Sequence, residues 1–101
     1  EYVRPFDDVE GRRMYLRCAR ALNNRDLLIR AAEIEQLSLP VLILWGEADD
    51  YQDPAVGQRL ADRLGAARLV VLKDAGHFLP EDQPEEIARL MRAFIRETSA
   101  R

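Results

Sequence analysis

Two unbroken apolar runs mark the places where strands are expected. The first, residues 41–45, holds five large apolar residues in a row, and Pro40 before it biases the entering chain toward an extended backbone. Such a run predicts a strand buried on both faces, as is typical of a parallel sheet. A second run, residues 69–72, predicts another strand over residues 68–72. In open parallel sheets the chemistry lies beyond the carboxyl ends of the strands, so the residues after each run are the first candidates for a site.

Helical patterns follow each run. Between the runs, Asp53 and Pro54 have the residue types of an N-cap and a first helical position, and Gly65 is placed to end that helix. The clearest pattern of the chain comes after the second run and is opened by Pro84. Its apolar residues recur at helical spacing: Ile87, Leu90, Met91, Phe94 and Ile95.

The segment before the first run has a different character. Residues 1–8 show no periodicity and predict an extended lead-in, residues 11–24 predict a helix, and residues 27–37 allow another helical turn. We therefore expect an α/β protein with a helical lead-in over residues 1–38 and a βαβα part over residues 39–101. The strand–helix–strand connection is expected to be right-handed.

Composition and charge narrow the classes of function. The 101 residues carry a net charge of −3, and the arginines are spread among acids, so we expect no nucleic-acid partner. Cys18 is the single cysteine, which excludes a disulfide framework and a cysteine-based metal site. No apolar stretch approaches the roughly 20 residues of a membrane span, and no signal peptide is recognisable. We expect a cytoplasmic protein without a membrane partner.

Asp49 and His77 are the candidate reactive residues. Asp49 follows the first run, and His77, the single histidine of the chain, follows the second. A carboxylate that holds a histidine in one tautomer, and stabilises its protonated form, is half of a nucleophilic triad. Taken alone, a loop histidine is more often a surface residue and such an aspartate a turn residue or cap. Gly76 permits a tight turn before His77, and the apolar residues 78–80 suit the edge of a pocket. Trp45 is expected to pack under the loop that carries Asp49, called the acid loop below.

Two motifs resemble the C-terminal third of an α/β-hydrolase: residues 40–49 (PVLILWGEAD) and residues 74–85 (DAGHFLPEDQPE). The similarity covers residues 40–96, and the order of acid before histidine matches that of the family. The resemblance implies that Asp49 is the triad acid and that His77 is the triad histidine and general base. The fold it implies is the C-terminal βαβα portion of that family, with two parallel strands and flanking helices.

The same resemblance bears on neighbouring residues and on the substrate. The family pattern Trp-Gly-x-x-Asp selects Asp49 over the adjacent Asp50. Asp74 is expected to cap or position the loop that carries His77, called the histidine loop below. Residues 1–38 correspond to the end of a cap region or to the helix after it. The histidine motif is similar to that of epoxide hydrolases and haloalkane or haloacetate dehalogenases, and also of serine esterases and carbon–carbon bond hydrolases. It implies hydrolysis of a small-molecule substrate through a covalent ester intermediate, with no metal and no organic cofactor.

One departure from the family pattern is large. The family nucleophile sits in a Gly-x-Ser-x-Gly elbow or an aspartate equivalent, but Ser38 and Ser99, the serines of this chain, lack that context. We therefore expect the chain to be inactive alone, with the nucleophile supplied by the remainder of a longer hydrolase. The chain starts at Glu1 rather than at methionine, which agrees with a processed product or a piece of a longer protein.

Other interpretations remain open. The alternative function is that of a non-catalytic, truncated α/β module that acts in oligomerisation or binding. Two parallel strands with two helices are expected to leave an unpaired strand edge and one uncovered sheet face. The expected partner is therefore the missing N-terminal part of the fold or a second copy of the chain, and a strictly monomeric particle in sedimentation would count against the second copy. A phosphate-binding βαβ domain is disfavoured, because no Gly-rich loop joins strand to helix and the acids of that loop would repel phosphate.

Overall fold

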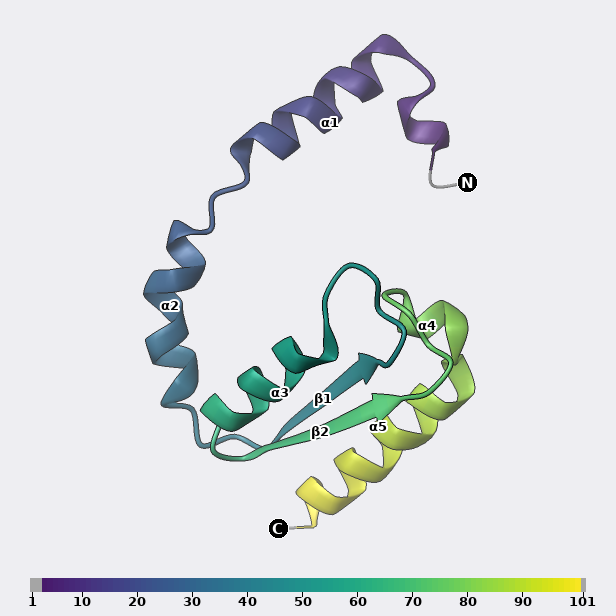
Figure 1. Ribbon diagram of the computed structural model, residues 1–101. Coiled ribbons are helices and arrows are strands. Elements are labelled where there is room, and N and C mark those ends of the chain that lie inside the picture. Colours follow the sequence, from purple (N-terminus) through teal and green to yellow (C-terminus); the bar gives the residue numbers. More distant parts are fainter. Residues whose placement is uncertain (1–2, 101) are drawn as a thin grey trace. The chain divides into compact units, whose positions relative to one another are not determined.

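The computed structural model describes residues 3–100, of which residues 26 and 27 are described by their backbone alone. The chain divides into two compact units between Ala32 and Glu33, and α2 spans the division. The elements along the chain (Figure 1) are the 3-10 helix η1 (Arg4–Phe6), α1 (Val9–Ala21), α2 (Arg25–Glu35), β1 (Val41–Gly46), α3 (Pro54–Arg63), β2 (Ala67–Leu72), α4 (Leu79–Asp82) and α5 (Pro84–Ser99).

The strands β1 and β2 form a two-stranded parallel sheet, as the two apolar runs predict. The register pairs Val41 with Ala67 at one end and Gly46 with Leu72 at the other, so the two strands end side by side. The helix α3 connects the strands and packs against both of them, while α5 packs against β1. The arrangement is the strand–helix–strand unit that the sequence indicates (Figure 1).

The helices α3 and α5 cover opposite faces of the sheet. Successive side chains of a strand point to opposite faces, so Arg68 and Leu69 mark one face each. On the Leu69 face, a β-carbon at Gly57 of α3 would lie 3.4 Å from the Leu69 side chain. On the other face, Arg68 donates a 2.9 Å hydrogen bond to Glu97 of α5, and its guanidinium lies 5.7 Å from the centroid of the Phe94 ring. The expectation of one uncovered face is therefore wrong, because α5 folds back over the face that α3 leaves open.

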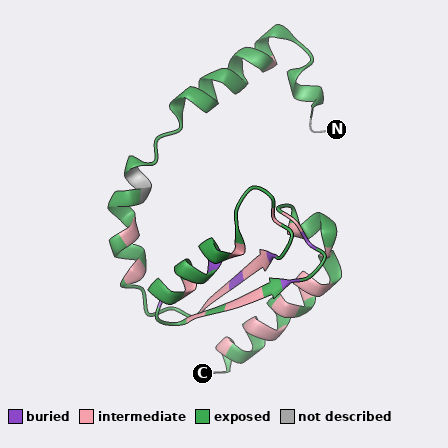
Figure 2. Ribbon diagram, in the orientation of Figure 1, coloured by how far each residue is buried: buried purple, intermediate pink, exposed green. Residues whose placement is uncertain are grey.

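The core of the second unit is small. Within residues 3–100 the buried apolar residues are Ile43, Leu64, Leu72 and Ala75. The other large residues of β1 are half-buried, and β1 has one neighbouring strand in the described part of the chain. In Figure 2 the buried and half-buried positions gather on the sheet and along α5. The strand β1 is covered on both faces but open along one edge, so it is less buried than its sequence predicts.

The first unit forms through local contacts between η1 and α1. Asp8 caps α1 by accepting a 2.6 Å hydrogen bond from the Gly11 N–H group. A side chain at Gly11 would collide with the Pro5 carbonyl, so glycine permits this close approach. The expected extended lead-in is wrong for Arg4–Phe6, which form a 3-10 turn, while residues 1 and 2 lie outside the described residues.

The helices before the sheet differ from expectation mainly in extent. The helix expected over residues 11–24 is α1, which begins at Val9 and ends at Ala21. The single turn expected within residues 27–37 is instead the 11-residue helix α2. Among the described residues, no helix combines the length and the apolar character that a bilayer crossing requires.

We expect Gly57→Ala to destabilise the second unit. A β-carbon at this position would lie 2.7 Å from Cε3 of the Trp45 ring, closer than real β-carbons come, so α3 would have to shift away from the sheet. The helix propensity of alanine offsets part of that cost. We expect a net loss of about 1–2 kcal/mol in the free energy of unfolding, measured by urea titration.

The matched control is Gly65→Ala. No heavy atom lies within 4 Å of a β-carbon built at Gly65, and its φ is outside the left-handed region. This variant should leave the free energy of unfolding unchanged or raise it by up to about 1 kcal/mol. Equal losses in the two variants would contradict the direct packing of α3 on the Trp45 ring.

Candidate active site

Asp49 lies in the turn that follows β1, and its carboxylate organises that turn. Its Oδ1 atom accepts hydrogen bonds from the backbone N–H groups of Tyr51 and Gln52, both at 2.9 Å. An aspartate that bonds the backbone two and three residues ahead is a common device of tight turns. The Asp49 side chain is only 7% exposed, and these bonds leave its second oxygen, Oδ2, for another partner.

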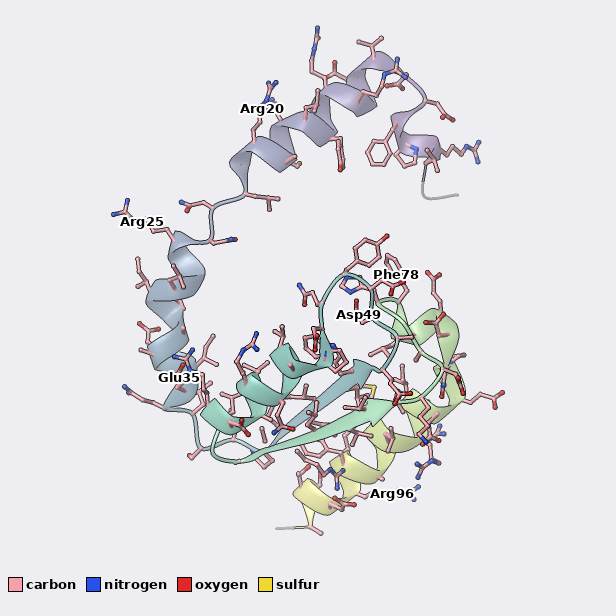
Figure 3. The ribbon with its side chains drawn as sticks, in the orientation of Figure 1. Arg20, Arg25, Glu35, Asp49, Phe78 and Arg96 are labelled. Atoms are coloured by element: carbon pink, nitrogen blue, oxygen red, sulfur yellow. The ribbon has the colours of Figure 1, made fainter. Side chains whose placement is uncertain are left out.

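That partner is His77, in the loop between β2 and α4. Its Nδ1 lies 3.0 Å from Asp49 Oδ2, which is hydrogen-bond distance. When Nδ1 carries the proton that is donated to the carboxylate, Nε2 is left free to accept one. In Figure 3, Asp49 and Phe78, the residue after His77, lie together beyond the carboxyl ends of the strands. The structure therefore brings together the two residues that the sequence singles out.

The two loops touch through their backbones. The Ala48 N–H group donates a 3.0 Å hydrogen bond to the Ala75 carbonyl. A side chain at Gly46 would collide with the carbonyl oxygens of Ala75 and Gly76. Glycine at the end of β1 therefore allows the close approach that sets the carboxylate beside the imidazole.

The surroundings of Asp49 act on its pKa in opposite directions. Burial works to raise the pKa, but the hydrogen bond with His77, the bonds from the N–H groups of Gln52 and Tyr51, and the Coulombic attraction to His77 together outweigh it. The pKa of Asp49 consequently lies below the ordinary value of 3.8. Asp49 is therefore a carboxylate at neutral pH, as an anion that orients a histidine must be.

Two residues that the sequence analysis missed hold the histidine loop from the α4 side. Asp82 Oδ2 accepts a 2.7 Å hydrogen bond from the Gly76 N–H group, and the Gln83 side-chain amide donates to the Lys73 carbonyl. Asp74, expected to cap or position this loop, contributes through its backbone, with a φ of 56° in the left-handed region. The sequence signal for the contact between Asp82 and the loop is an acid six positions after Gly76. An acid at that position is equally typical of the start of a helix, so it did not indicate the contact.

Aromatic rings surround the imidazole. The Tyr51 and Phe78 rings lie 5.2 Å and 5.4 Å from the His77 ring between centroids. Trp45 packs under the acid loop, as expected, and its indole N–H donates a 3.0 Å hydrogen bond to the Gln52 carbonyl. A cavity of about 160 Å³ beside the pair is lined by Leu44, Trp45, Asp49, Gln52, His77 and Leu79. Within residues 3–100, no group of three or more His, Cys, Asp or Glu side chains is placed to hold a metal ion.

We expect Asp49→Asn to weaken the dependence of stability on pH in acid. A carboxyl group whose pKa is lower in the folded than in the unfolded chain stabilises the fold fully above its unfolded pKa. It loses that contribution as the pH falls through its folded pKa. The free energy of unfolding of the parent should therefore decline as the pH falls through 3.8 and below, and part of this decline should be absent from the variant. Urea unfolding at a series of pH values measures the difference.

Asp50→Asn is the matched control, because Asp50 is the exposed neighbour of Asp49. This variant should keep the slope of the parent. An Asp49→Asn slope that equals the parent slope would contradict the hydrogen bonds of Asp49 as the source of its lowered pKa.

Comparisons with known proteins agree with this architecture. The model of the alpha/beta hydrolase family matches residues 1–90. The uncharacterized hydrolase YugF from Bacillus subtilis is 30% identical over 95 residues, which cover 94% of this chain and 34% of that protein. The rhodomycin D methylesterase DauP from Streptomyces is 32% identical in an alignment 103 residues long. That alignment covers 91% of this chain and 35% of DauP. Epoxide hydrolase 3 from Xenopus tropicalis is 30% identical over 64 residues, which cover 62% of this chain and 17% of that protein.

A solved structure gives the same result for the fold. The crystal structure of a CIB-like hydrolase from Thermoplasma acidophilum matches 74% of this chain and 35% of its own, with a TM-score of 0.64 and 23% identity. The chain spans about a third of the length of YugF and DauP. The α/β fold class and the family resemblance are confirmed, and the chain belongs to the alpha/beta hydrolase family.

Proposed function

We propose that this chain supplies the acid and the histidine of a catalytic triad, Asp49 and His77, to a hydrolase whose nucleophile lies in another part of the protein. The observation that carries the proposal is the 3.0 Å separation between His77 Nδ1 and Asp49 Oδ2. A carboxylate in this position orients the imidazole and stabilises the imidazolium that forms during the reaction. Both residues follow parallel strands, at the sheet edge where α/β proteins place their sites.

The proposed reaction has two halves and uses no metal or organic cofactor. In the first half the nucleophile attacks the substrate and forms a covalent ester. A serine nucleophile gives its hydroxyl proton to His77 Nε2, which passes it to the leaving group. An aspartate nucleophile is already ionised and has no proton to lose, so the oxygen of an opened epoxide takes its proton from solvent. In the second half Nε2 takes a proton from water, whose oxygen attacks the ester. The ester C–O bond then breaks and releases the product, and Nε2 returns the proton to the departing oxygen, which belongs to the serine or, with an aspartate nucleophile, to the product alcohol. Asp49 stays ionised throughout, in line with its lowered pKa.

The relatives support a small-molecule substrate with a carbon–oxygen bond that water can open. DauP is named as a methylesterase, and the Xenopus relative is named as an epoxide hydrolase. Hydrolysis of a methyl ester and of an epoxide both add water across such a bond. The partly apolar cavity beside His77 suits the carbon skeleton next to the reacting group.

We further propose that the 101-residue chain alone has no turnover. Ser38 precedes the six-residue strand β1, and Asp49 follows it, so the two lie about 20 Å apart along the strand. Ser99 ends the 16-residue helix α5, which begins beside the histidine loop, so it lies about 24 Å away along the helix. These separations support a nucleophile that comes from outside this chain.

The test of the triad uses the longest natural form of the protein, with p-nitrophenyl esters and styrene oxide as probe substrates. We expect His77→Ala and Asp49→Asn each to lower kcat by about 1,000- to 10,000-fold without changing the circular dichroism spectrum. Asp50→Asn is the matched control and should turn over like the parent. The isolated chain should leave the probes at their rate in buffer.

Two results would overturn the proposal. Turnover that survives His77→Ala would show that the pair has no catalytic role. The protein would then be a non-catalytic module that acts in binding or oligomerisation. Turnover by the isolated chain, lost on Ser38→Ala or Ser99→Ala, would place the nucleophile within it.

A further inference from the structure

The peptide group between Ala75 and Gly76 is held at both of its polar atoms. Its carbonyl accepts a 3.0 Å hydrogen bond from Ala48 N–H in the acid turn. Its N–H donates a 2.7 Å hydrogen bond to Asp82 Oδ2 at the end of α4. The peptide plane that leads into His77 is therefore fixed between the acid turn on one side and α4 on the other.

The hydrogen bond from Gly76 N–H to Asp82, which we call the anchor, acts at the residue of the loop with the most conformational freedom. Glycine adopts more backbone conformations than any other residue, and the two dihedral angles of Gly76 set the direction in which His77 leaves the loop. The His77 side chain is 40% exposed, so packing holds only part of its surface. A hydrogen bond to an ionised acceptor is shorter and stronger than a neutral one. The carboxylate of Asp82 thus restrains the residue whose backbone most affects the imidazole.

Asp82 does not take the place of the triad acid. The Nδ1 atom of His77 is paired with Asp49, and Asp82 Oδ2 is engaged by the backbone of Gly76. The next residue, Gln83, strengthens the anchor by donating to the Lys73 carbonyl in the same loop.

We propose that Asp82 is a positioning residue for His77. Through the Gly76 peptide, its carboxylate keeps the imidazole in line with Asp49 and its Nε2 directed toward the nucleophile. The effect on the imidazole can be measured in the chain itself, while the consequence for turnover rests on the proposed function of His77.

The first test reads the imidazole directly. His77 is the single histidine, so its ring nitrogens give the only histidine signals of the ¹⁵N-labelled chain. A neutral imidazole bonded to Asp49 carries its proton on Nδ1, whereas a released neutral ring exchanges between two tautomers. We expect the parent to show the Nδ1–H form and Asp82→Ala to show a mixture. The Gly76 amide of this variant should exchange with solvent about tenfold faster.

Two further variants make the test specific. Asp82→Asn keeps an acceptor without its charge, so its Gly76 exchange rate should lie between those of the parent and Asp82→Ala. Arg68→Ala removes the 2.9 Å bond to Glu97 near the other end of α5, so it lowers stability without touching the loop. This control should keep the parent tautomer.

Several outcomes would overturn the proposal. One is a parent-like tautomer in Asp82→Ala, and another is a mixture in Arg68→Ala, because general loss of stability would then be enough to release the ring. If Asp82→Ala does not fold, Asp82→Asn decides, and a Gly76 exchange rate equal to that of the parent rejects the role.

The second test uses the complete enzyme. Asp82→Ala should lower kcat by about tenfold to a hundredfold with KM little changed, because a misplaced base impairs proton transfer rather than binding. Asp82→Asn should restore most of the loss. Full kcat in Asp82→Ala beside an inactive His77→Ala would reject the positioning role alone, whereas an active His77→Ala would reject the proposed function itself.

Discussion

The parallel pairing of β1 with β2 is the constraint on which the second unit depends. Because the last residues of the two strands stand opposite each other, their loops leave the sheet at the same edge. Two glycines allow close packing in this unit. Gly46 leaves room for the histidine loop, and Gly57 lets α3 lie directly on the Trp45 ring. The separation between Asp49 and His77 is therefore set by the backbone, with side-chain packing in a supporting part.

The two members of the pair have unequal surroundings. Asp49 is nearly enclosed, and the hydrogen bonds that it accepts offset the cost of burying a charge. His77 is more open, with the aromatic rings of Tyr51 and Phe78 on its flanks. A fixed anion beside a partly exposed imidazole suits the proposed role of His77 as a base that must gain and return a proton.

Most of the second unit could be predicted because its signals are local. Apolar runs mark β1 and β2, an N-cap and a proline mark α3, and helical spacing marks α5. The features that the sequence did not reveal depend on where the chain returns in space. The helix α5 covers the second sheet face only because it folds back along β1, and Asp82 meets Gly76 only because α4 turns toward the loop. The adjacency of Asp49 and His77 was predictable from strand order, while their catalytic role remains a prediction.

Asp49 and His77 lie in the loops that follow β1 and β2, 28 positions apart on one continuous stretch of the chain. The distance between them therefore does not depend on how this stretch would meet the remainder of the proposed hydrolase. A shift at that boundary moves both residues together relative to the proposed nucleophile, and it leaves the carboxylate and the imidazole aligned with each other. In the proposed hydrolase, evolution can consequently reshape the boundary, and with it the substrates that fit, while the geometry between Asp49 and His77 is kept.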